Sequence, residues 1–343
     1  MPQSLSGPRK ASYALFILVL VGVARYELGP CLLSGLVSYM ILDLTERRLR
    51  ARGSRPLAAR GVALAVFAIM AAGLAWVFVE FLRVGLARLP VLLDTVLPRL
   101  TALSEQYGLA LPVDNARELR DLIVASVKEN AASVGKTSGL LTRGFFQIVA
   151  GMFAAVMRFL SPSGAPGQTS LFDSLCVEFS ARVALFVRSF ERVVGAQVTI
   201  SVANTFLTAS FLHVMGFPFR SFLTLTTFVC GMLPIVGNVI SNTIIVTAGL
   251  TVSVQLAMFG LAYLVLIHKV EYVLNSRIVG GSIDIPMWMT LLGLVVGEAA
   301  MGVPGVLLAP ALLHYAREEL RAIPAASMAS EAALPRDNAR SAA

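Results

Sequence analysis

The sequence predicts an all-α fold, a polytopic transmembrane helix bundle of the inner-membrane type with about eight hydrophobic segments. Of its 343 residues, 57% are hydrophobic and only 14% are charged, and the mean hydropathy is +0.77. Soluble globular proteins carry charge on roughly a quarter of their residues. Because one crossing of about 30 Å of hydrocarbon takes about 20 residues, the chain has little room for a separate enzyme domain.

The positive charge of the chain indicates membrane topology and not nucleic-acid binding. The net charge is +8 at pH 7, and several arginines gather between two apolar runs. They are Arg47, Arg48, Arg50, Arg52, Arg55 and Arg60. Short loops rich in Lys and Arg stay in the cytoplasm, and no aromatic residues alternate with these arginines. We therefore expect the lipid bilayer, and no nucleic acid, as a partner.

Neither a metal nor a cofactor is expected. The residues that most often hold metals are Cys31, Cys176, Cys230, His213, His268 and His314. None of them has a partner at metal-ligand spacing, and the histidines lie near the ends of apolar runs, where interfacial side chains are common. The segment 130–137 resembles a phosphate-binding loop, but it lacks the leading glycine and follows a predicted helix instead of a strand.

The first third of the chain predicts three membrane segments. Residues 1–11 form a cytoplasmic tail, and residues 12–83 hold the three segments with the arginine-rich loop between the second and the third. The first two segments meet at a Gly29-Pro30 break, which predicts a tight hairpin. Arg9 and Lys10 precede the first segment as in a signal peptide, but no small-residue cleavage pattern follows, so we expect an uncleaved helix.

Residues 84–143 are polar enough to lie outside the membrane as an amphipathic helical insert. Apolar side chains recur there at helical spacing, with charged ones on the opposite side. The apolar positions include Leu119, Leu122, Ile123 and Val127. This stripe can pack on the bundle, on a neighbouring subunit or on the membrane surface, and the sequence does not distinguish these.

Residues 144–322 are predicted to form the transport core, followed by a disordered tail at 323–343. A fourth span at 144–160 and a mixed-charge helix ending at Arg192 open the core. From residue 221 to residue 267 the chain contains no Asp, Glu, Lys, Arg or His. This length is too great for one helix and predicts two or more segments.

Two apolar stretches of the core are interrupted by helix breakers. Those of the first stretch are Gly231, Pro234, Gly237, Asn238 and Asn242, and those of the second, 286–316, are Gly302, Pro304, Gly305 and Pro310. Breakers at membrane depth free backbone groups, which must face protein or a water-filled cavity. Paired interrupted segments usually mark the binding site of a transporter. Whether 221–250 and 286–316 are full crossings or re-entrant hairpins stays open.

Polar side chains also occur inside otherwise apolar helices. Ser201, Asn204, Thr205 and Thr208 lie on one face of the helix 196–215. They either line a polar path or form hydrogen bonds between helices, and we favour the hydrogen bonds.

Glu298 carries a charge inside an apolar segment. A charge at a helix centre costs about 2.5–3.5 kcal/mol, which apolar neighbours can offset, so the carboxylate is expected to face the bundle. It is either a protonation or cation site or a neutral acid that bonds another helix. Nearby, Gly293 and Gly297 form a small-xxx-small pair that allows close helix packing.

Four sequence blocks carry a family resemblance. They are Gly216-Phe-Pro-Phe219, Gly231-Met-Leu-Pro-Ile-Val-Gly237, Glu271-Tyr-Val-Leu-Asn-Ser-Arg-Ile-Val-Gly280 and Gly302-Val-Pro-Gly-Val-Leu-Leu-Ala-Pro310. In this order and spacing they resemble the autoinducer-2 exporter family, or PerM-like permeases, strongly over residues 193–320 and more weakly over 12–192. The chain departs from the family in Glu298, where a small residue commonly follows the glycine, and in a compact loop after the fourth span.

The resemblance implies an eight-segment oligomeric membrane protein. It implies export of small molecules such as the autoinducer-2 signal, or exchange of sodium for protons in other members. It also implies that certain residues occupy the motif positions of the family. These are Pro234, Gly237, Asn275, Arg277, Gly280 and Pro310.

The functional prediction is secondary transport or export of a small polar solute, without a nucleotide motor. The positive-inside rule places the basic ends of the chain in the cytoplasm, which requires an even number of crossings. A neutral hydroxylated solute fits best, and a coupling ion would use Glu298. Candidates for the transport path are Pro234, Gly237, Asn238, Asn242, Asn275, Arg277, Gly280, Glu298, Pro304, Gly305 and Pro310.

Two alternatives to solute export stay open. A sodium (cation)/proton antiporter would need a membrane carboxylate, for which Glu298 is the candidate. A non-transporting membrane scaffold would instead dock partners on the insert 84–143. An enzyme is not expected, because no nucleophile, base and orienting group occur together.

Overall fold

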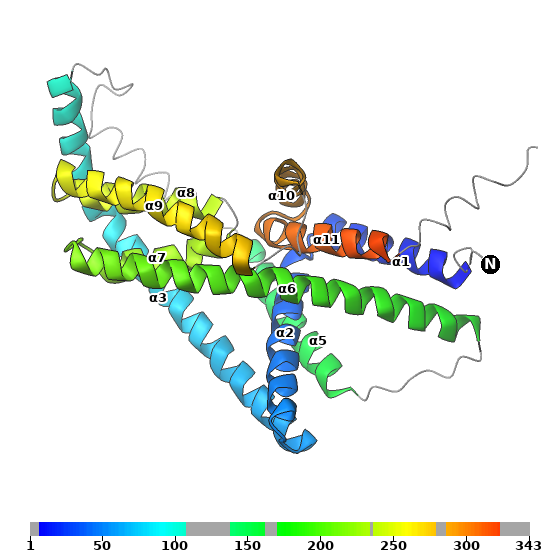
Figure 1. Cartoon of the computed structure of the whole chain (residues 1–343). Helices are drawn as coiled ribbons and strands as arrows, with labels where there is room; N and C mark the ends of the chain where they lie inside the picture. The colour runs from blue at the N-terminus through cyan, green and yellow to red at the C-terminus, as the bar shows by residue number, and fades with distance from the viewer. Residues whose placement is uncertain (1–6, 108–137, 162–169, 234–235, 279–285, 323–343) are drawn as a thin grey trace, which may run out of the picture. The chain divides into compact units, whose positions relative to one another are not determined.

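The computed structural model describes residues 7–107, 138–161, 170–233, 236–278 and 286–322. Within these ranges every regular element is an α-helix (Figure 1). The helices are α1 (Gly7–Arg25), α2 (Gly29–Ala51), α3 (Pro56–Tyr107), α5 (Ser138–Leu160), α6 (Leu171–Val214), α7 (Arg220–Gly231), α8 (Val236–Leu250), α9 (Val254–Ile278), α10 (Met287–Met301) and α11 (Val303–Arg321). The apolar stripe from Leu119, the segment 130–137 and the tail 323–343 lie outside the described residues.

Several of the described helices are long and apolar enough to cross a membrane. The four candidate spans are Gly7–Arg25, Pro56–Trp76, Arg143–Leu160 and Leu171–Val214. Shorter apolar helices follow at Gly237–Leu250, Val254–Val270 and Trp288–Met301. The prediction of an all-α, polytopic membrane bundle is confirmed.

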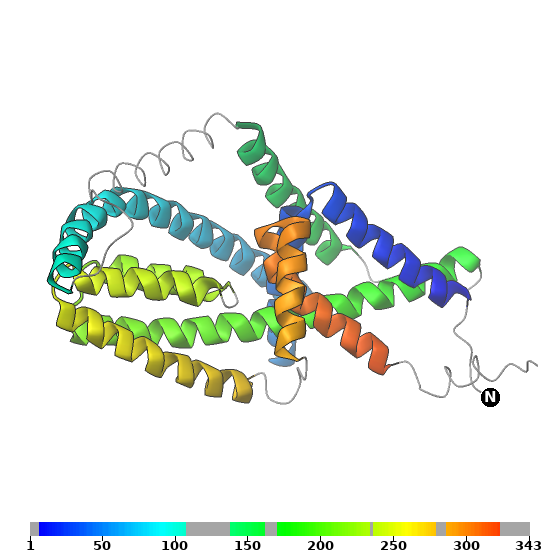
Figure 2. The same cartoon turned by 90° about the horizontal axis from the view of Figure 1, so that it is seen from above.

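Two helices are longer than the sequence analysis predicted. α3 has 52 residues and continues past residue 83 to Tyr107, and it curves in its second half (Figure 2). The mixed-charge helix that we expected to end at Arg192 and the apolar helix after it form one helix of 44 residues, α6. The intervening Gly195 costs only about 1 kcal/mol relative to alanine, which is too little to end a helix with good helix formers on both sides.

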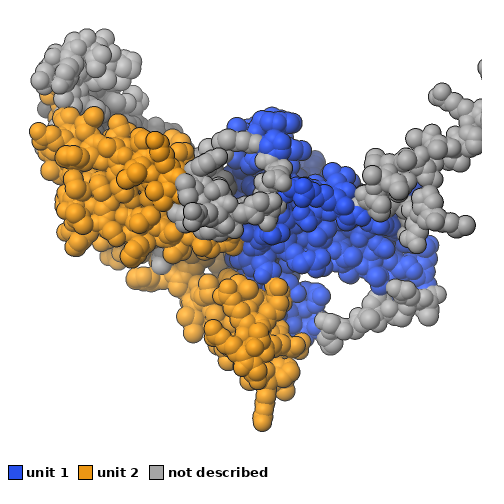
Figure 3. Space-filling model, viewed as in Figure 1, with its two compact units in different colours: residues 1–40, 151–193, 285–343 blue, residues 41–150, 194–284 orange. Residues whose placement is uncertain are grey.

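The chain divides into two compact units, coloured separately in Figure 3. Unit 1 consists of residues 1–40, 151–193 and 285–343, and unit 2 consists of residues 41–150 and 194–284. Unit 1 therefore holds α1, α10 and α11 with the first half of α6. Unit 2 holds α3, α7, α8 and α9 with the second half of α6.

An apolar core around Phe217 holds unit 2 together. Its buried members are Leu212, Phe217, Leu223, Ile245, Ala248, Leu256, Leu264 and Ile267. The Phe217 ring fits between two glycines: a Cβ atom added to Gly249 would lie 3.1 Å from Phe217 Cε1, and one added to Gly260 would lie 3.2 Å from Phe217 Cζ. The small size of both glycines therefore makes room for this ring.

The turn after α6 explains the Gly216-Phe-Pro-Phe block. Gly216 has φ +68°, and its N–H donates to His213 O at 3.3 Å while Phe217 N–H donates to Leu212 O at 3.0 Å. This is a Schellman motif, in which a glycine in the left-handed region ends a helix. The ring of Phe211 lies 5.5 Å from that of Phe217, so the motif also directs Phe217 into the core.

Aromatic side chains form the centre of unit 1. Phe16 of α1, Phe186 of α6 and Tyr315 of α11 meet with ring centroids 4.9–6.0 Å apart. Backbone contacts between glycines add to this packing, because a Cβ atom on Gly35 would lie 3.3 Å from the Gly151 carbonyl oxygen. α2 and α5 therefore cross at close range within unit 1.

Much of the predicted arginine-rich loop is helical. α2 continues to Ala51 and α3 begins at Pro56, so only a short turn separates them. Asp43 pairs with Arg47 at 2.7 Å, and Glu46 pairs with Arg50 at 2.6 Å and with Arg60 at 3.2 Å. Some of the positive charge of this region is thus neutralised by acidic residues, one turn away on α2 for Arg47 and Arg50 and on the neighbouring helix for Arg60.

Candidate functional site

The two interrupted stretches form two helical hairpins of short helices. α7 has 12 residues and α8 has 15, which at 1.5 Å per residue are roughly 18 and 22 Å long. α10, with 15 residues, is equally short. A full crossing needs about 30 Å, so α7, α8 and α10 are each too short to cross alone, whereas α11, with 19 residues, is nearly long enough.

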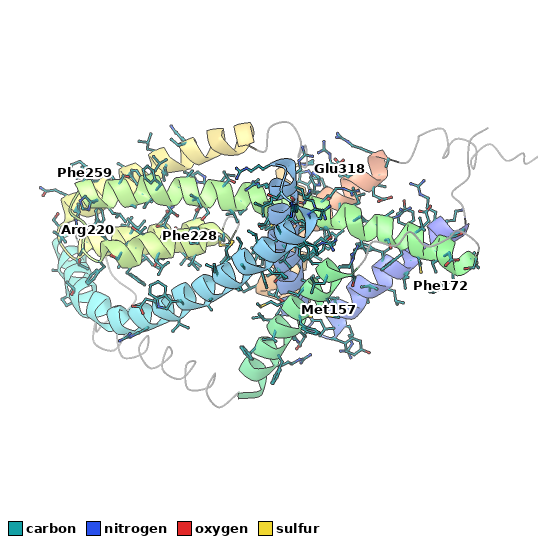
Figure 4. The ribbon with its side chains drawn as sticks, turned by 90° about the horizontal axis from the view of Figure 1, so that it is seen from below. Met157, Phe172, Arg220, Phe228, Phe259 and Glu318 are labelled. Carbon is teal, nitrogen blue, oxygen red and sulfur yellow. The ribbon has the colours of Figure 1, made fainter. Side chains whose placement is uncertain are left out.

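The last four carbonyl oxygens of α7 all accept hydrogen bonds from the protein. Two donors are side chains of α6: Ser201 Oγ donates to Phe228 O at 2.9 Å, and Gln197 Nε2 donates to Gly231 O at 2.7 Å. Phe228 is labelled in Figure 4. The other two bonds come from the backbone, Met232 N–H to Val229 O at 3.3 Å and Leu233 N–H to Cys230 O at 2.8 Å. The helix end is therefore satisfied by protein, as the membrane interior requires.

Two glycines make this hairpin possible. A Cβ atom on Gly231 would lie 2.7 Å from Ser201 Oγ, and one on Gly237 would overlap the carbonyl oxygen of Cys230. The second contact is with backbone and cannot be relieved by a rotamer change. Gly237 thus occupies a motif position because α7 and α8 touch there, whereas Pro234 lies outside the described residues.

A layer of neutral polar side chains is buried in unit 2. Its members are the buried Ser201, Asn204, Thr208, Thr226, Thr227 and Ser241 and the half-buried Thr205, whose Oγ1 atom is buried. Most of these hydroxyls have protein partners. Thr208 Oγ1 donates to Asn204 Oδ1 at 3.3 Å and lies 3.3 Å from Tyr263 OH.

Two hydroxyls of this layer are unsatisfied. Thr205 Oγ1 and Thr226 Oγ1 are buried and have no hydrogen-bond partner in the part of the chain that the structure describes. In native proteins such atoms usually meet water, an ion or a ligand. The polar face of α6 therefore forms the hydrogen bonds between helices that the sequence analysis favoured, and it leaves Thr205 Oγ1 without a partner among the described residues.

The hydroxyls of Thr205 and Thr226 lie at similar positions along the antiparallel helices α6 and α7. The bonds from Gln197 to Gly231 and from Ser201 to Phe228 show that α6 and α7 run antiparallel. Thr205 lies one turn beyond Ser201, about 6 Å farther along the axis of α6. Because the helices are antiparallel, Thr226 lies on the same side of Phe228, about 3 Å along the axis of α7. The two hydroxyls are therefore separated in depth by less than one helical turn.

The remaining candidates of unit 2 are only partly described. Asn238 and Asn242 are half-buried on α8, and Ser241 Oγ donates to Asn238 O at 3.3 Å. Asn275 and Arg277 belong to α9, but their side chains lie outside the described part of the structure, as does Gly280.

The α10–α11 hairpin of unit 1 turns at Gly302, which has φ +64°. Pro304 lies in the first turn of α11, where its missing N–H costs nothing. A Cβ atom on Gly297 would lie 2.5 Å from Gly305 O, so the glycine pair predicted to allow close packing does so. Pro310 lies inside α11 and cannot donate to the carbonyl one turn earlier.

The position of the Glu298 side chain differs from the one that the sequence analysis predicted. The face of α10 toward α11 is made by Gly293 and Gly297, whose added Cβ atoms would touch Leu313 and Gly305. Glu298 lies beside this face and is exposed. No described residue forms an ion pair or hydrogen bond with its carboxylate.

A buried charged cluster in unit 1 was missed by the sequence analysis. Tyr13 OH donates to Glu319 Oε1 at 2.5 Å, and Arg182 pairs with Glu178 at 2.8 Å and with Glu319 at 3.5 Å. The Arg182 guanidinium also lies over the Tyr13 ring, 4.6 Å from its centroid. Arg9 approaches Glu319 at 3.9 Å, so two arginines balance two glutamates.

Part of this cluster had a local sequence signal. Glu178 and Arg182 are one helical turn apart, which predicts a pair on α6. Nothing local distinguishes the buried Glu319 from its neighbour Glu318, which is less buried. The partners of Glu319 come from distant parts of the chain.

Long apolar helices combined with short, glycine-packed hairpins define a multi-pass membrane protein with broken segments, the architecture of many secondary transporters. The sequence model of the AI-2E family transporters matches residues 12–325, and the chain belongs to this family. A protein of Bacillus subtilis (strain 168) named "Putative transport protein YdbI" is 32% identical over 128 residues, which are 36% of either chain. The predicted family is confirmed.

Proposed function

We propose that this transporter exports a small neutral hydroxylated solute, of the autoinducer-2 type, and binds it at the polar layer of unit 2. It would do so as a homo-oligomer in a bacterial inner membrane, with both termini in the cytoplasm. α7–α8 and α10–α11 would be re-entrant hairpins. Family membership supports transport, and the chemistry of the layer supports this class of solute.

The observation that carries the proposal is the pair of unused hydroxyls, Thr205 Oγ1 and Thr226 Oγ1. A solute hydroxyl can both donate to and accept from a threonine hydroxyl. The bond replaces one that the solute loses on leaving water, which is needed because an uncompensated buried hydroxyl is costly. A polyhydroxylated solute would therefore satisfy both threonines.

The absence of charge in the sequence around the layer argues against a charged solute. Residues 221–267 contain no Asp, Glu, Lys, Arg or His, and this range covers α8 and most of α7 and α9. Burying an ion without a counter-charge is much more costly than burying a hydroxyl. Cation/proton antiport through Glu298 has less support, because that carboxylate is exposed on α10.

Solute efflux from proteoliposomes tests this proposal. Purified protein is reconstituted with autoinducer-2 inside the vesicles, and efflux is measured for Thr205→Val and Thr226→Val. Each variant keeps the side-chain shape and removes one hydroxyl. Because a neutral hydrogen bond contributes about 1 kcal/mol, we expect the half-saturating concentration to rise roughly fivefold in each variant.

The chain offers two matched controls. Thr199 on α6 and Thr243 on α8 are exposed, and each hydroxyl bonds a carbonyl of its own helix. Thr199→Val and Thr243→Val are expected to leave the half-saturating concentration unchanged. Equal effects in all four variants would contradict the proposed site, and no efflux from wild-type vesicles would contradict the proposed solute.

A further inference from the structure

A strip of polar and aromatic contacts joins α6 to α11 inside unit 1. The contacts pair Arg182 with Glu319 at 3.5 Å, Phe186 with Tyr315 at 6.0 Å between ring centroids, and Ser189 Oγ with His314 Nδ1 at 3.1 Å. Residue numbers rise along α6 as they fall along α11, so the helices are antiparallel here. The strip thus runs from a charged end at Glu319 to a neutral end at His314.

His314 is the most buried of the three histidines, with 2% of its surface exposed. One ring nitrogen, Nδ1, lies against Ser189 Oγ. The other, Nε2, is buried and has no hydrogen-bond partner among the described residues, and the same is true of Tyr315 OH next to it in sequence. A buried ring nitrogen without a partner indicates that water or a transferable proton belongs beside it.

Of the titratable groups on the strip between α6 and α11, His314 is the one that can change its protonation state. The two glutamates of the charged cluster are already balanced by Arg9 and Arg182. The charges that act on the imidazole are Glu318 and Arg317 on α11 and Arg192 on α6. Imidazole is the side chain that ordinarily gains and loses a proton near neutral pH.

We propose that His314 is a proton-binding site that couples solute transport to proton movement. This inference rests on the proposed transport function and names its coupling residue, which differs from Glu298. With its hydrogen on Nδ1, the neutral ring donates to Ser189 Oγ and presents the Nε2 lone pair to the incoming proton. The proton leaves by the same atom.

Protonation can be measured without any solute. The chain has three histidines, so histidine-selective NMR of the wild-type protein in lipid nanodiscs gives few signals. His213→Gln and His268→Gln assign them by elimination. We expect the His314 ring signal to titrate as the pH is lowered from 8.5 to about 5. A His314 signal that stays neutral over this range would overturn the proposal.

Coupling is measured by autoinducer-2 efflux with and without an imposed pH gradient. In wild-type vesicles the gradient is expected to change the flux, and in His314→Gln this dependence is lost while flux without a gradient persists. His213→Gln, at an exposed histidine, and Glu298→Gln are expected to keep the dependence. Glu318→Gln, at the residue labelled on α11 in Figure 4, is expected to keep it too.

The outcomes separate the two proposals. If wild-type vesicles move no autoinducer-2, the proposed solute fails and the NMR titration alone decides whether His314 binds a proton. If wild-type flux does not respond to the gradient, or responds equally in His314→Gln, the coupling role is overturned while export stands. Loss of the response in Glu298→Gln alone would assign coupling to that carboxylate and overturn the role of His314.

Discussion

Units 1 and 2 are held together by different chemistry. In unit 1, a charged cluster of Arg9, Arg182, Glu178 and Glu319 joins three helices. In unit 2, an apolar core surrounds Phe217. The contacts of Gln197 and Ser201 with the end of α7 are neutral, and the charged contact between Arg220 and His213 is exposed. A buried ion pair stabilises only while both partners are present, whereas a neutral bond to a carbonyl carries a smaller desolvation cost. The two units should therefore differ in how much one substitution costs.

The chain provides a separate probe for each unit. Its two tryptophans are Trp76 in unit 2 and Trp288 in unit 1, and both are exposed. Trp76→Phe leaves a reporter for unit 1, and Trp288→Phe leaves a reporter for unit 2. Unfolding followed by fluorescence in these two backgrounds shows which unit a variant destabilises.

Arg182→Met is expected to have the largest effect. It leaves the buried Glu319 with only the more distant Arg9 and the partly exposed Glu178 without its cation. Removing one partner of a fully buried ion pair typically costs about 3–5 kcal/mol, so the loss is expected toward the lower end of that range. The loss should appear in the unfolding of unit 1. Adding Glu319→Gln should restore part of the stability, because it removes the more buried of the two unpaired charges. An unchanged unfolding midpoint for Arg182→Met would contradict the importance of the cluster.

Gln197→Leu is expected to have an intermediate effect, in unit 2. It leaves Gly231 O buried without a donor, at a cost of about 1–3 kcal/mol. The unfolding midpoint reported by Trp76 should fall, and the buried Cys230 in the last turn of α7 should react faster with a water-soluble thiol reagent. A loss as large as that of Arg182→Met would remove the contrast between the units.

Gly195→Ala is expected to have the smallest effect, and of opposite sign. The glycine lies inside α6 with open space where a Cβ atom would be, so alanine should stabilise the helix by up to about 1 kcal/mol. The unfolding midpoint should rise slightly. Gly305→Ala is the matched contrast, because its Cβ atom would overlap the carbonyl of Gly297, and it should destabilise the α10–α11 hairpin.

Local patterns predicted most of the architecture. Apolar length predicted the membrane helices, and helix breakers marked the two stretches that each divide into a pair of helices. The spacing of Gly293 and Gly297 predicted the close packing against α11. Each of these signals lies within a few helical turns. The forces that produce these features also act within a few helical turns, because the length of an apolar segment and the steric limits of the backbone are local properties.

Pairing between distant residues was not predictable in this way. Glu319 meets Tyr13 across most of the chain, and α11 carries Glu318 and Glu319 side by side, so composition cannot decide which one is buried. The unused hydroxyls of Thr205 and Thr226 became visible only when the partners of Ser201 and Thr208 were assigned. Glu298 was expected to face inward, but close packing by glycines already occupies that side of α10.

The packing of Phe217 against Gly249 and Gly260 limits which substitutions evolution can accept at these three positions. The ring fills the space that Gly249 and Gly260 leave empty, so the three positions share one fixed volume. A larger residue at position 249 or 260 is tolerated only together with a smaller residue at position 217. A smaller residue at position 217 alone leaves a cavity, which a larger residue in place of one of the glycines would fill. Across relatives these three positions should therefore change in concert.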